Sequence, residues 1–206
     1  MIDLADALRV VRKTRRPQDI VITTMAASRA WMADGTVPLD FTFVPSCMGH
    51  ATSLGLGLAL AQPQRRVIVC NGDGSMLMNL GSLVSISAAG VRNIVVIILD
   101  NGVYEVTGAQ PTPGSAAGRA LGARVNFAAI AQGAGFSAVY HFQEDAAWTA
   151  KGAESLGADG PVFIWLDIVP VPGRPGPRSP GPAAERASAF MAAVAEADID
   201  NQPKER

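Results

Sequence analysis

The stretch CNGDGSMLMNLGSLVSISAAGVRNIVVIILDNGVYEVTG, residues 70 to 108, decides how this chain folds. It contains two turns, GDGS at 72–75 and DNG at 100–102, and an apolar strand precedes each of them. An apolar helix is predicted between the strands, over 75–89, with Gly90 as its C-terminal cap. A strand–helix–strand unit of this kind is typical of a parallel sheet, in which both strands end at the same edge. The two turns are therefore expected to meet.

The rest of the chain continues the alternation of strands and helices. Strands are predicted at 19–24, 40–45, 65–74, 93–101, 137–142 and 161–170. Helices are predicted at 3–13, 28–34, 49–62, 75–89, 126–136 and 144–156, the second of them capped by Ser28. This alternation predicts an α/β fold with an open, mostly parallel sheet and helices on both faces. The most apolar run, 93–101, is expected at the centre of the sheet, and 102–125 is predicted to be a mobile loop.

The glycine and proline content predicts the packing and the domain organisation. Glycines in the helix 49–62 suggest that it packs closely against another backbone. One domain is expected over residues 1–170. It is followed over 171–206 by a linker and a helical tail, because VPVPGRPGPRSPGP at 169–182 cannot form a packed core whereas 183–198 can form a helix.

The composition argues against several classes of protein. The 206 residues are 49% hydrophobic and 17% charged, with a net charge of −1, which allows a sizeable core. A protein that coats nucleic acid or an anionic membrane would normally be more basic, so neither partner is expected. No apolar run reaches the roughly 20 residues of a membrane helix. Cys47 and Cys70 form no metal-ligand pattern or disulfide framework, and the N-terminus is unlike a signal peptide, which together predict a cytoplasmic protein.

The GDGS turn has the features of an anion site. Gly72 and Gly74 allow a ligand to approach the backbone closely, and the helix that begins near Ser75 offers free N–H groups that suit a diphosphate. Ligands of open parallel sheets bind at the carboxyl ends of the strands, where this turn is expected.

The second turn adds the ligands of a hard cation. Asp73 supplies a carboxylate, Asn101 an amide oxygen, and the main chain near Val103 a third oxygen. Mg²⁺ prefers oxygen ligands and commonly shares them between one or two carboxylates and substrate phosphates. Either turn alone is more often a simple turn than a site, but the pair, 28 residues apart across one strand–helix–strand unit, favours a metal-bound diphosphate.

These motifs resemble a known family. GDGS followed by LDNGVY is similar to the cofactor motif of thiamine-diphosphate-dependent enzymes. The segments SCMGHATSLGLGLALAQPQRRVIVCNGDGSMLMNLGSL and DNGVYEVTGAQPT resemble the diphosphate-binding half of phosphonopyruvate and sulfopyruvate decarboxylases, over roughly residues 15 to 170. The resemblance implies thiamine diphosphate and Mg²⁺ as cofactors.

The resemblance also implies roles for individual residues. The Mg²⁺ ligands would be Asp73, Asn101 and the main-chain oxygen of Val103. Met48 would hold the cofactor in a bent conformation, while His50 would lie near the diphosphate or the reacting centre and Glu105 would donate a proton or contact substrate. The full set of implied cofactor-binding residues is Ser46, Cys47, Met48, Gly49, Gly72, Asp73, Gly74, Ser75, Asn101, Val103 and Tyr104. Without the resemblance, Met48 would be interpreted as core and His50 as a helix-start histidine. For Glu105, a solvated loop acid and a functional acid would be equally good interpretations.

The chain departs from this family at two places. Asp100 stands where many relatives have asparagine, and it is interpreted as structural rather than as added charge near the metal. The segment TTMAASRAW at 23–31 lacks the Gly-Lys pair of phosphonate and sulfonate relatives, and only Arg29 remains as an anion contact. A substrate other than phosphonopyruvate or sulfopyruvate is therefore expected.

The family activates its cofactor with a glutamate of a separate pyrimidine-binding domain. The first glutamate of this chain is Glu105, which follows the metal motif. The chain is therefore predicted to be the β-type subunit of a split 2-oxo acid decarboxylase, a hetero-oligomer whose α-type partner carries the glutamate. Its small 2-oxo acid substrate would yield an aldehyde and CO₂, with helices 49–62 and 75–89 as candidates for the shared surface.

Three other functions fit parts of the pattern. An acetolactate-synthase-like carboligase would use the same residues of this chain. A 2-oxoacid oxidoreductase subunit commonly carries cysteines for an iron–sulfur cluster, and two cysteines cannot supply four ligands. A non-catalytic diphosphate-binding module would use GDGS as an anion nest and bind many diphosphates.

Overall fold

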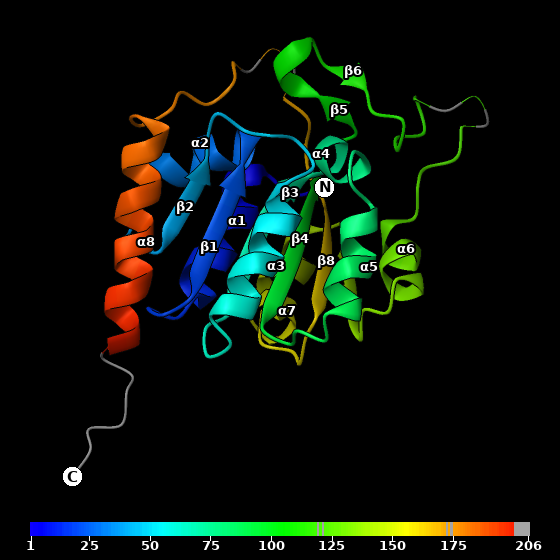
Figure 1. Ribbon diagram of the computed structural model, residues 1–206. Helices are drawn as coiled ribbons and strands as arrows, with labels where there is room; N and C mark the ends of the chain where they lie inside the picture. Colours follow the sequence, from blue (N-terminus) through cyan, green and yellow to red (C-terminus); the bar gives the residue numbers. More distant parts are fainter. Residues whose placement is uncertain (119, 121, 172, 174, 200–206) are drawn as a thin grey trace.

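The predicted α/β class is confirmed by a computed structural model that describes residues 1–118, 120, 122–171, 173 and 175–199. Six parallel strands form an open sheet in the order β2-β1-β3-β4-β8-β7 (Figure 1). The strands are β1 (Ile20–Thr24), β2 (Asp40–Phe43), β3 (Val67–Gly72), β4 (Ile94–Asp100), β7 (Ala138–Phe142) and β8 (Val162–Asp167). Every residue of β4 is buried, and the strand lies between β3 and β8, as its apolar sequence predicts.

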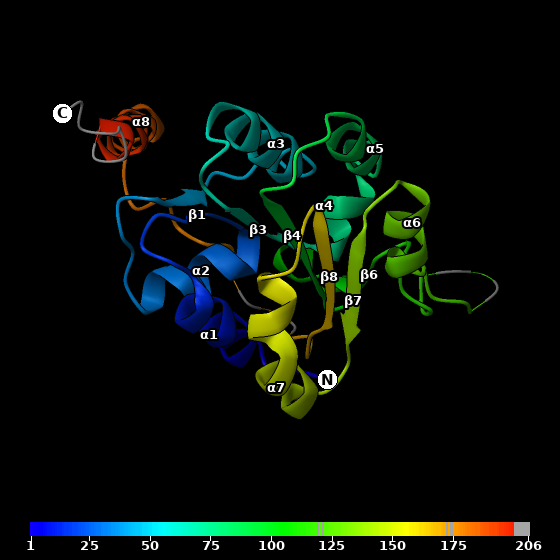
Figure 2. The same ribbon diagram turned by 90° about the horizontal axis from the view of Figure 1, so that it is seen from below.

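Helices cover both faces of the sheet and bury two apolar clusters against it (Figure 2). On one face lie α1 (Leu4–Thr14), α2 (Met25–Ala33) and α7 (Asp145–Leu156). On the other face lie α3 (Ala51–Ala61), α5 (Gly81–Ala88), α6 (Phe127–Gly133) and α8 (Ala183–Ile199). In the described part of the chain, no helix is both long and apolar enough to span a membrane.

Helix α3 packs closely on the sheet, as its glycines predict. A Cβ atom at Gly55 would lie 2.5 Å from Cγ2 of Val69, a buried residue of β3. Val69 is β-branched and has few alternative rotamers, so it cannot move aside easily. Gly57 lies on the same helix, and a Cβ atom there would meet no described residue outside the helix within 4 Å. Contact with the sheet therefore requires glycine at one of these two positions.

Two helices begin or end elsewhere than predicted. Helix α2 begins at Met25, so Ser28 lies inside it and its hydroxyl is 3.1 Å from that of Thr23 instead of capping the helix. The helix expected over 75–89 is divided into α4 (Asp73–Leu77) and α5, because the chain turns at 78–80. Gly90 follows α5 with φ +67°, a left-handed conformation typical of a C-terminal cap.

The segment 102–125 is more regular than the predicted loop. Strands β5 (Val103–Tyr104) and β6 (Gln110–Pro111) form an antiparallel hairpin, and the 3₁₀ helix η1 (Glu105–Thr107) lies between them. The Thr107 hydroxyl lies 3.0 Å from Gln110 Oε1 and 3.5 Å from the Tyr104 carbonyl oxygen, and these contacts tie the hairpin together. This hairpin lies beyond the carboxyl ends of the strands (Figure 1).

We expect Gly55→Ala to lower the free energy of unfolding by about 1–3 kcal/mol, because the added methyl group overlaps Val69. Gly57→Ala is the matched control on the same helix. It should change the stability by less than about 1 kcal/mol, in the stabilising direction, because alanine favours the helix and meets no neighbour. Urea unfolding of both variants measures this, and an equal effect at the two positions would contradict the close packing.

Candidate functional site

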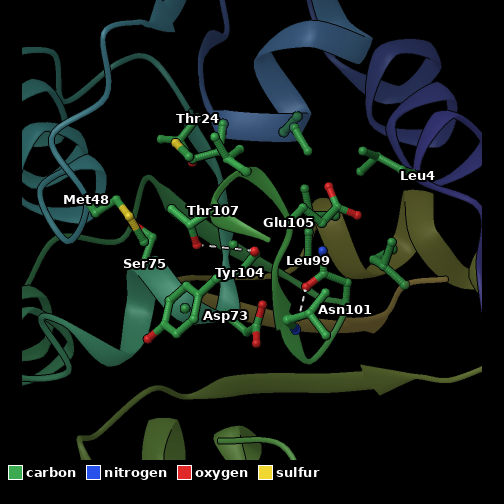
Figure 3. Close-up of a pocket in the computed structure, with 18 residues that line it drawn as sticks. Leu4, Thr24, Met48, Asp73, Ser75, Leu99, Asn101, Tyr104, Glu105 and Thr107 are labelled. Atoms are coloured by element: carbon green, nitrogen blue, oxygen red, sulfur yellow. Dashed lines mark hydrogen bonds between the residues drawn. The ribbon is translucent and has the colours of Figure 1, made fainter. Parts of the chain in front are cut away.

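A cavity lies where strands β1, β3, β4 and β8 end, under the β5–η1–β6 hairpin (Figure 3). Each strand delivers the residues that follow its carboxyl end to this one place. Most of the residues singled out in the sequence line it, namely Met48, Gly72, Asp73, Gly74, Ser75, Asn101, Val103, Tyr104 and Glu105.

Asp73 is the buried acid of the cavity. It is 2% exposed, and Oδ2 accepts a hydrogen bond of 2.9 Å from the Thr112 hydroxyl. Burial and the negative charge of Asp100 raise the pKa of Asp73 to about 7, although the Thr112 bond acts in the opposite direction. The carboxylate is therefore held in a position where a cation would relieve its unfavourable charge.

The DNG turn presents Asn101 next to Asp73. Gly72 pairs with Leu99 in the register of β3 and β4, so the residues that follow these two strands are neighbours. Asn101 Oδ1 accepts from the Val103 amide at 3.0 Å, and Gly102 has φ +72°, which favours glycine. This geometry brings an amide oxygen and a main-chain turn to the cavity beside one carboxylate.

Tyr104 covers the backbone at the start of α4. A Cβ atom at Gly74 would lie 2.4 Å from Cε1 of Tyr104, so the aromatic ring rests directly on the glycine. Figure 3 shows this ring close to Asp73. Any side chain at Gly74 would displace the ring, which explains why glycine is required at this point of the motif.

A charged cluster holds the DNG turn in place from the side away from the cavity. Arg124 donates to Asp100 at 2.6 Å and to both oxygens of Asp167 at 2.6 and 2.8 Å. Burial would raise the pKa of Asp167, but hydrogen bonds from Arg124 and His141 hold it below its usual value. Trp165 Nε1 also donates to Asp100 at 2.9 Å. Asp100 therefore makes the structural contacts expected of it, but its negative charge also acts on Asp73, whose pKa it raises.

Glu105 occupies an unusual position for a residue that the sequence places in a loop. It is 8% exposed, lines the cavity, and accepts a 3.0 Å hydrogen bond at Oε1 from the Val171 amide. Oε2 is buried and has no hydrogen-bond partner among the described residues. Figure 3 shows Glu105 on the side of the cavity where Leu4 lies, with Met48 and Ser75 on the opposite side.

The segment 46–50 reaches the cavity only through Met48. The Gly49 amide donates to the Ser75 hydroxyl at 2.9 Å, which joins this segment to α4. His50 and Cys47 are outside the lining, with the His50 ring 3.3 Å from the Cys47 sulfur and 3.1 Å from the Met48 carbonyl. Ser46 is also outside, and its buried hydroxyl has no partner in the described part of the chain.

Sequence reasoning missed one part of the site, and it singled out a second part only through the missing Gly-Lys pair. Thr112 bonds Asp73 from 39 residues away, and no local pattern marks it. The second part is the junction of β1 and α2, residues 24–27, which lies within the segment 23–31 and lines the cavity. Met25 at this junction has φ +48°, a strained conformation for a residue with a side chain. None of the described residues that line the cavity is a lysine, arginine or histidine, so Arg29 lies outside it.

The residues present fit a metal-bound diphosphate. One buried carboxylate with a raised pKa, one amide oxygen and one turn carbonyl form the donor set of a hard divalent cation that shares phosphate ligands. Of the two glycines in the GDGS segment, Gly72 has no neighbour within 4 Å of a Cβ position, whereas the Tyr104 ring covers Gly74.

The sequence matches a family of known proteins over most of its length. Residues 19–166 match the family "Thiamine pyrophosphate enzyme, C-terminal TPP binding domain". Sulfopyruvate decarboxylase subunit beta of Methanothermobacter thermautotrophicus is 34% identical over 170 residues, which cover 82% of this chain and 84% of that protein. Phosphonopyruvate decarboxylase of Streptomyces viridochromogenes is 35% identical over 89% of this chain, which spans only 44% of that protein.

Solved structures agree on the fold. Thiamine diphosphate-dependent 4-hydroxybenzoylformate decarboxylase of Rhodococcus jostii RHA1 has a TM-score of 0.63 and 22% identity, over 82% of this chain and 33% of that chain. A thiamin diphosphate-dependent enzyme of Mycobacterium smegmatis, described as putative, has the same TM-score at 20% identity, over 82% of this chain and 32% of that one.

We expect Asp73→Asn to stabilise the metal-free protein at high pH. The folded pKa of about 7 exceeds the ordinary 3.8, so Asp73 contributes stability that is complete below about pH 4 and is lost as the pH rises through 7. Asparagine cannot ionise and keeps an oxygen for Thr112. Its advantage should grow from about pH 4 to about pH 7 and then level off, at no more than ~4 kcal/mol. Urea unfolding without divalent ions measures it, and an advantage independent of pH would contradict the raised pKa.

Proposed function

Because the chain belongs to the thiamine pyrophosphate enzymes through their C-terminal TPP-binding domain, we propose that it is the diphosphate-binding subunit of a split 2-oxo acid decarboxylase. The enzyme releases CO₂ and an aldehyde. The observation that carries this proposal is the meeting of Asp73 and Asn101 at neighbouring strand ends in one cavity. The decarboxylases among its relatives support the reaction class.

The chain's main task is to hold and orient the cofactor. Asp73, Asn101 and the carbonyl of Val103 bind Mg²⁺, and the backbone of Gly74 and Ser75 receives the diphosphate. Met48, on the opposite side of the cavity from Glu105, packs against the organic part of the cofactor. The remaining cofactor contacts are assigned to Ser46, Cys47, Gly49, Gly72 and Tyr104.

Thiamine diphosphate, when bound, supplies the carbanion stabilisation that decarboxylation needs. Glu105 is the chain's proton-handling group, because it lines the cavity and its Oε2 has no hydrogen-bond partner among the described residues. His50 lies outside the cavity lining. It can contact the cofactor or substrate only if these, or the partner subunit, extend the site beyond the cavity. The hairpin that carries Glu105 excludes water from one side.

The activating glutamate is proposed to come from outside these 206 residues. The first glutamate of the sequence is Glu105, after the metal motif, and a relative of matching length is named subunit beta. Helices α3 and α5 bear exposed apolar side chains, with Leu60 56% and Val84 57% exposed, which suit a partner's surface. Both cysteines are free thiols, which agrees with assembly in the reducing cytoplasm.

The substrate is proposed to be a 2-oxo acid with a neutral side chain. The start of α2 contributes Met25, Ala26 and Ala27, and the described lining has no cationic side chain to balance a phosphonate or sulfonate. Asp73 and Glu105 would repel such a group unless the metal or the partner compensated.

We expect Asp73→Ala to abolish Mg²⁺-dependent binding of thiamine diphosphate while the fold is retained, because the site loses its one charged metal ligand. Calorimetry measures the affinity, and circular dichroism checks the fold. Asp159→Ala is the control, since Asp159 is an exposed acid whose only described ion pair is with Arg92. Retained affinity in folded Asp73→Ala would refute the metal assignment, and selectivity for ADP over thiamine diphosphate would favour the non-catalytic alternative.

We expect the chain alone to have little decarboxylase activity and the assembled enzyme to turn over 2-oxo acids. The chain is saturated with thiamine diphosphate and Mg²⁺, and CO₂ release is followed with and without the copurifying partner. The panel contains phosphonopyruvate, sulfopyruvate, and neutral aliphatic and aromatic 2-oxo acids, of which the neutral acids should have the higher kcat/KM. Turnover of the chain alone at about 1 per second or faster would rule out the split enzyme.

A further inference from the structure

The C-terminal segment is fixed over the site, although its sequence resembles a linker. The match to the family ends at residue 166, so membership of the family assigns no role to the residues beyond it. We use "strap" for the described residues of 169–182, which run from the end of β8 to the start of α8 (Figure 1).

The prolines of the strap determine which of its amides can donate. The sequence at 169–172 is VPVP, so only Val169 and Val171 have an N–H group there. Both are used: Val169 donates to the Ile2 carbonyl at 3.0 Å, and Val171 donates to Glu105 Oε1 at 3.0 Å. A valine that precedes proline favours extended backbone, in which the N–H group points away from the direction of the chain and can reach a neighbouring acceptor.

The far end of the strap is anchored as firmly. The Arg186 guanidinium donates to the carbonyl oxygens of Thr42 and Val44, and to the Ser179 hydroxyl at 3.2 Å. Phe190 of α8 packs on Phe41 of β2, with 5.0 Å between ring centroids. The chain around the strap is therefore held at the edge strand β2 as well as next to β8.

Between these anchors the strap contacts the hairpin that covers the cavity. A Cβ atom at Gly176 would lie 3.2 Å from Cγ1 of Val106, the residue after Glu105. The strap thus touches η1 at two consecutive residues, once through a hydrogen bond and once through packing.

We propose that the strap positions Glu105 for the reaction, with the amide of Val171 as the positioning group. The bond occupies Oε1 of a residue that lines the cavity, and it leaves the buried Oε2 as the oxygen without a hydrogen-bond partner among the described residues. A buried carboxylate with one free oxygen is unfavourable unless the surrounding structure holds it there. The inference rests on the proposed function in one respect only, because that function gives Glu105 its role as the proton-handling group.

The first test uses the full chain alone. Val171→Pro removes the donor, whereas Val171→Ala removes the side chain and keeps the amide. Hydrogen exchange of residues 103–111 should be about tenfold faster in the proline variant than in the alanine variant, with β3 and β4 equal in both. Equal exchange at 103–111 in the two variants would overturn the proposal.

A reciprocal pair covers the case in which Val171→Pro fails to fold. Glu105→Ala should expose the Val171 amide to exchange, measured by NMR, and Glu105→Gln, which keeps an acceptor oxygen, should protect it. An amide equally protected in both variants would show that Glu105 is not its partner.

The second test uses the assembled enzyme with its preferred 2-oxo acid. Val171→Pro should lower kcat by about 10- to 100-fold relative to Val171→Ala, with the affinity for thiamine diphosphate and Mg²⁺ unchanged. In a Glu105→Gln background the proline substitution should have no further effect, because it acts through Glu105. A loss of the same size in that background would assign the strap a structural role only.

If the assembled enzyme is inactive on every 2-oxo acid, the proposed function fails, while the exchange measurements still decide whether the strap holds Glu105.

Discussion

Three carboxyl groups lie side by side at the ends of adjacent parallel strands, and their mutual repulsion must be offset by the chain that covers these strand ends. The strand register places Asp73, which follows Gly72, next to Asp100, and it pairs Asp100 with Asp167. Arg124 neutralises the second and third of these acids. Asp73 receives only hydrogen bonds, and its pKa rises to about 7. Positive charge is therefore most favourable beside Asp73, where the diphosphate-bound metal is proposed.

The same acids organise the segment that covers the cavity. Thr112 and Arg124 belong to one stretch of chain, and they bond Asp73 and the Asp100–Asp167 pair respectively. The stretch 102–125 is thus tied to the strand ends at two points. The hairpin of β5 and β6 stays over the cavity because of these contacts, although its glycines would otherwise favour mobility.

The site has two sides with different origins. Asp73, Gly74 and Asn101 belong to the part of the chain that matches the family, and they line the side proposed to hold the cofactor. Glu105 depends on Val171, which lies beyond that match, for its orientation. The residues proposed to bind the diphosphate are therefore separate from the contact proposed to position Glu105.

The sequence by itself determined the α/β class, the alternation of six parallel strands with helices, and the two glycine-containing motifs at adjacent strand ends. These are local properties, because apolar periodicity and turn glycines act over a few residues. Tertiary structure decided the start of α2 at Met25, the engagement of Asp100 by Arg124, and the bond from Val171 to Glu105 across 66 residues. Strand register and long-range packing produce these contacts, and no local pattern encodes which distant donor reaches a given carboxylate.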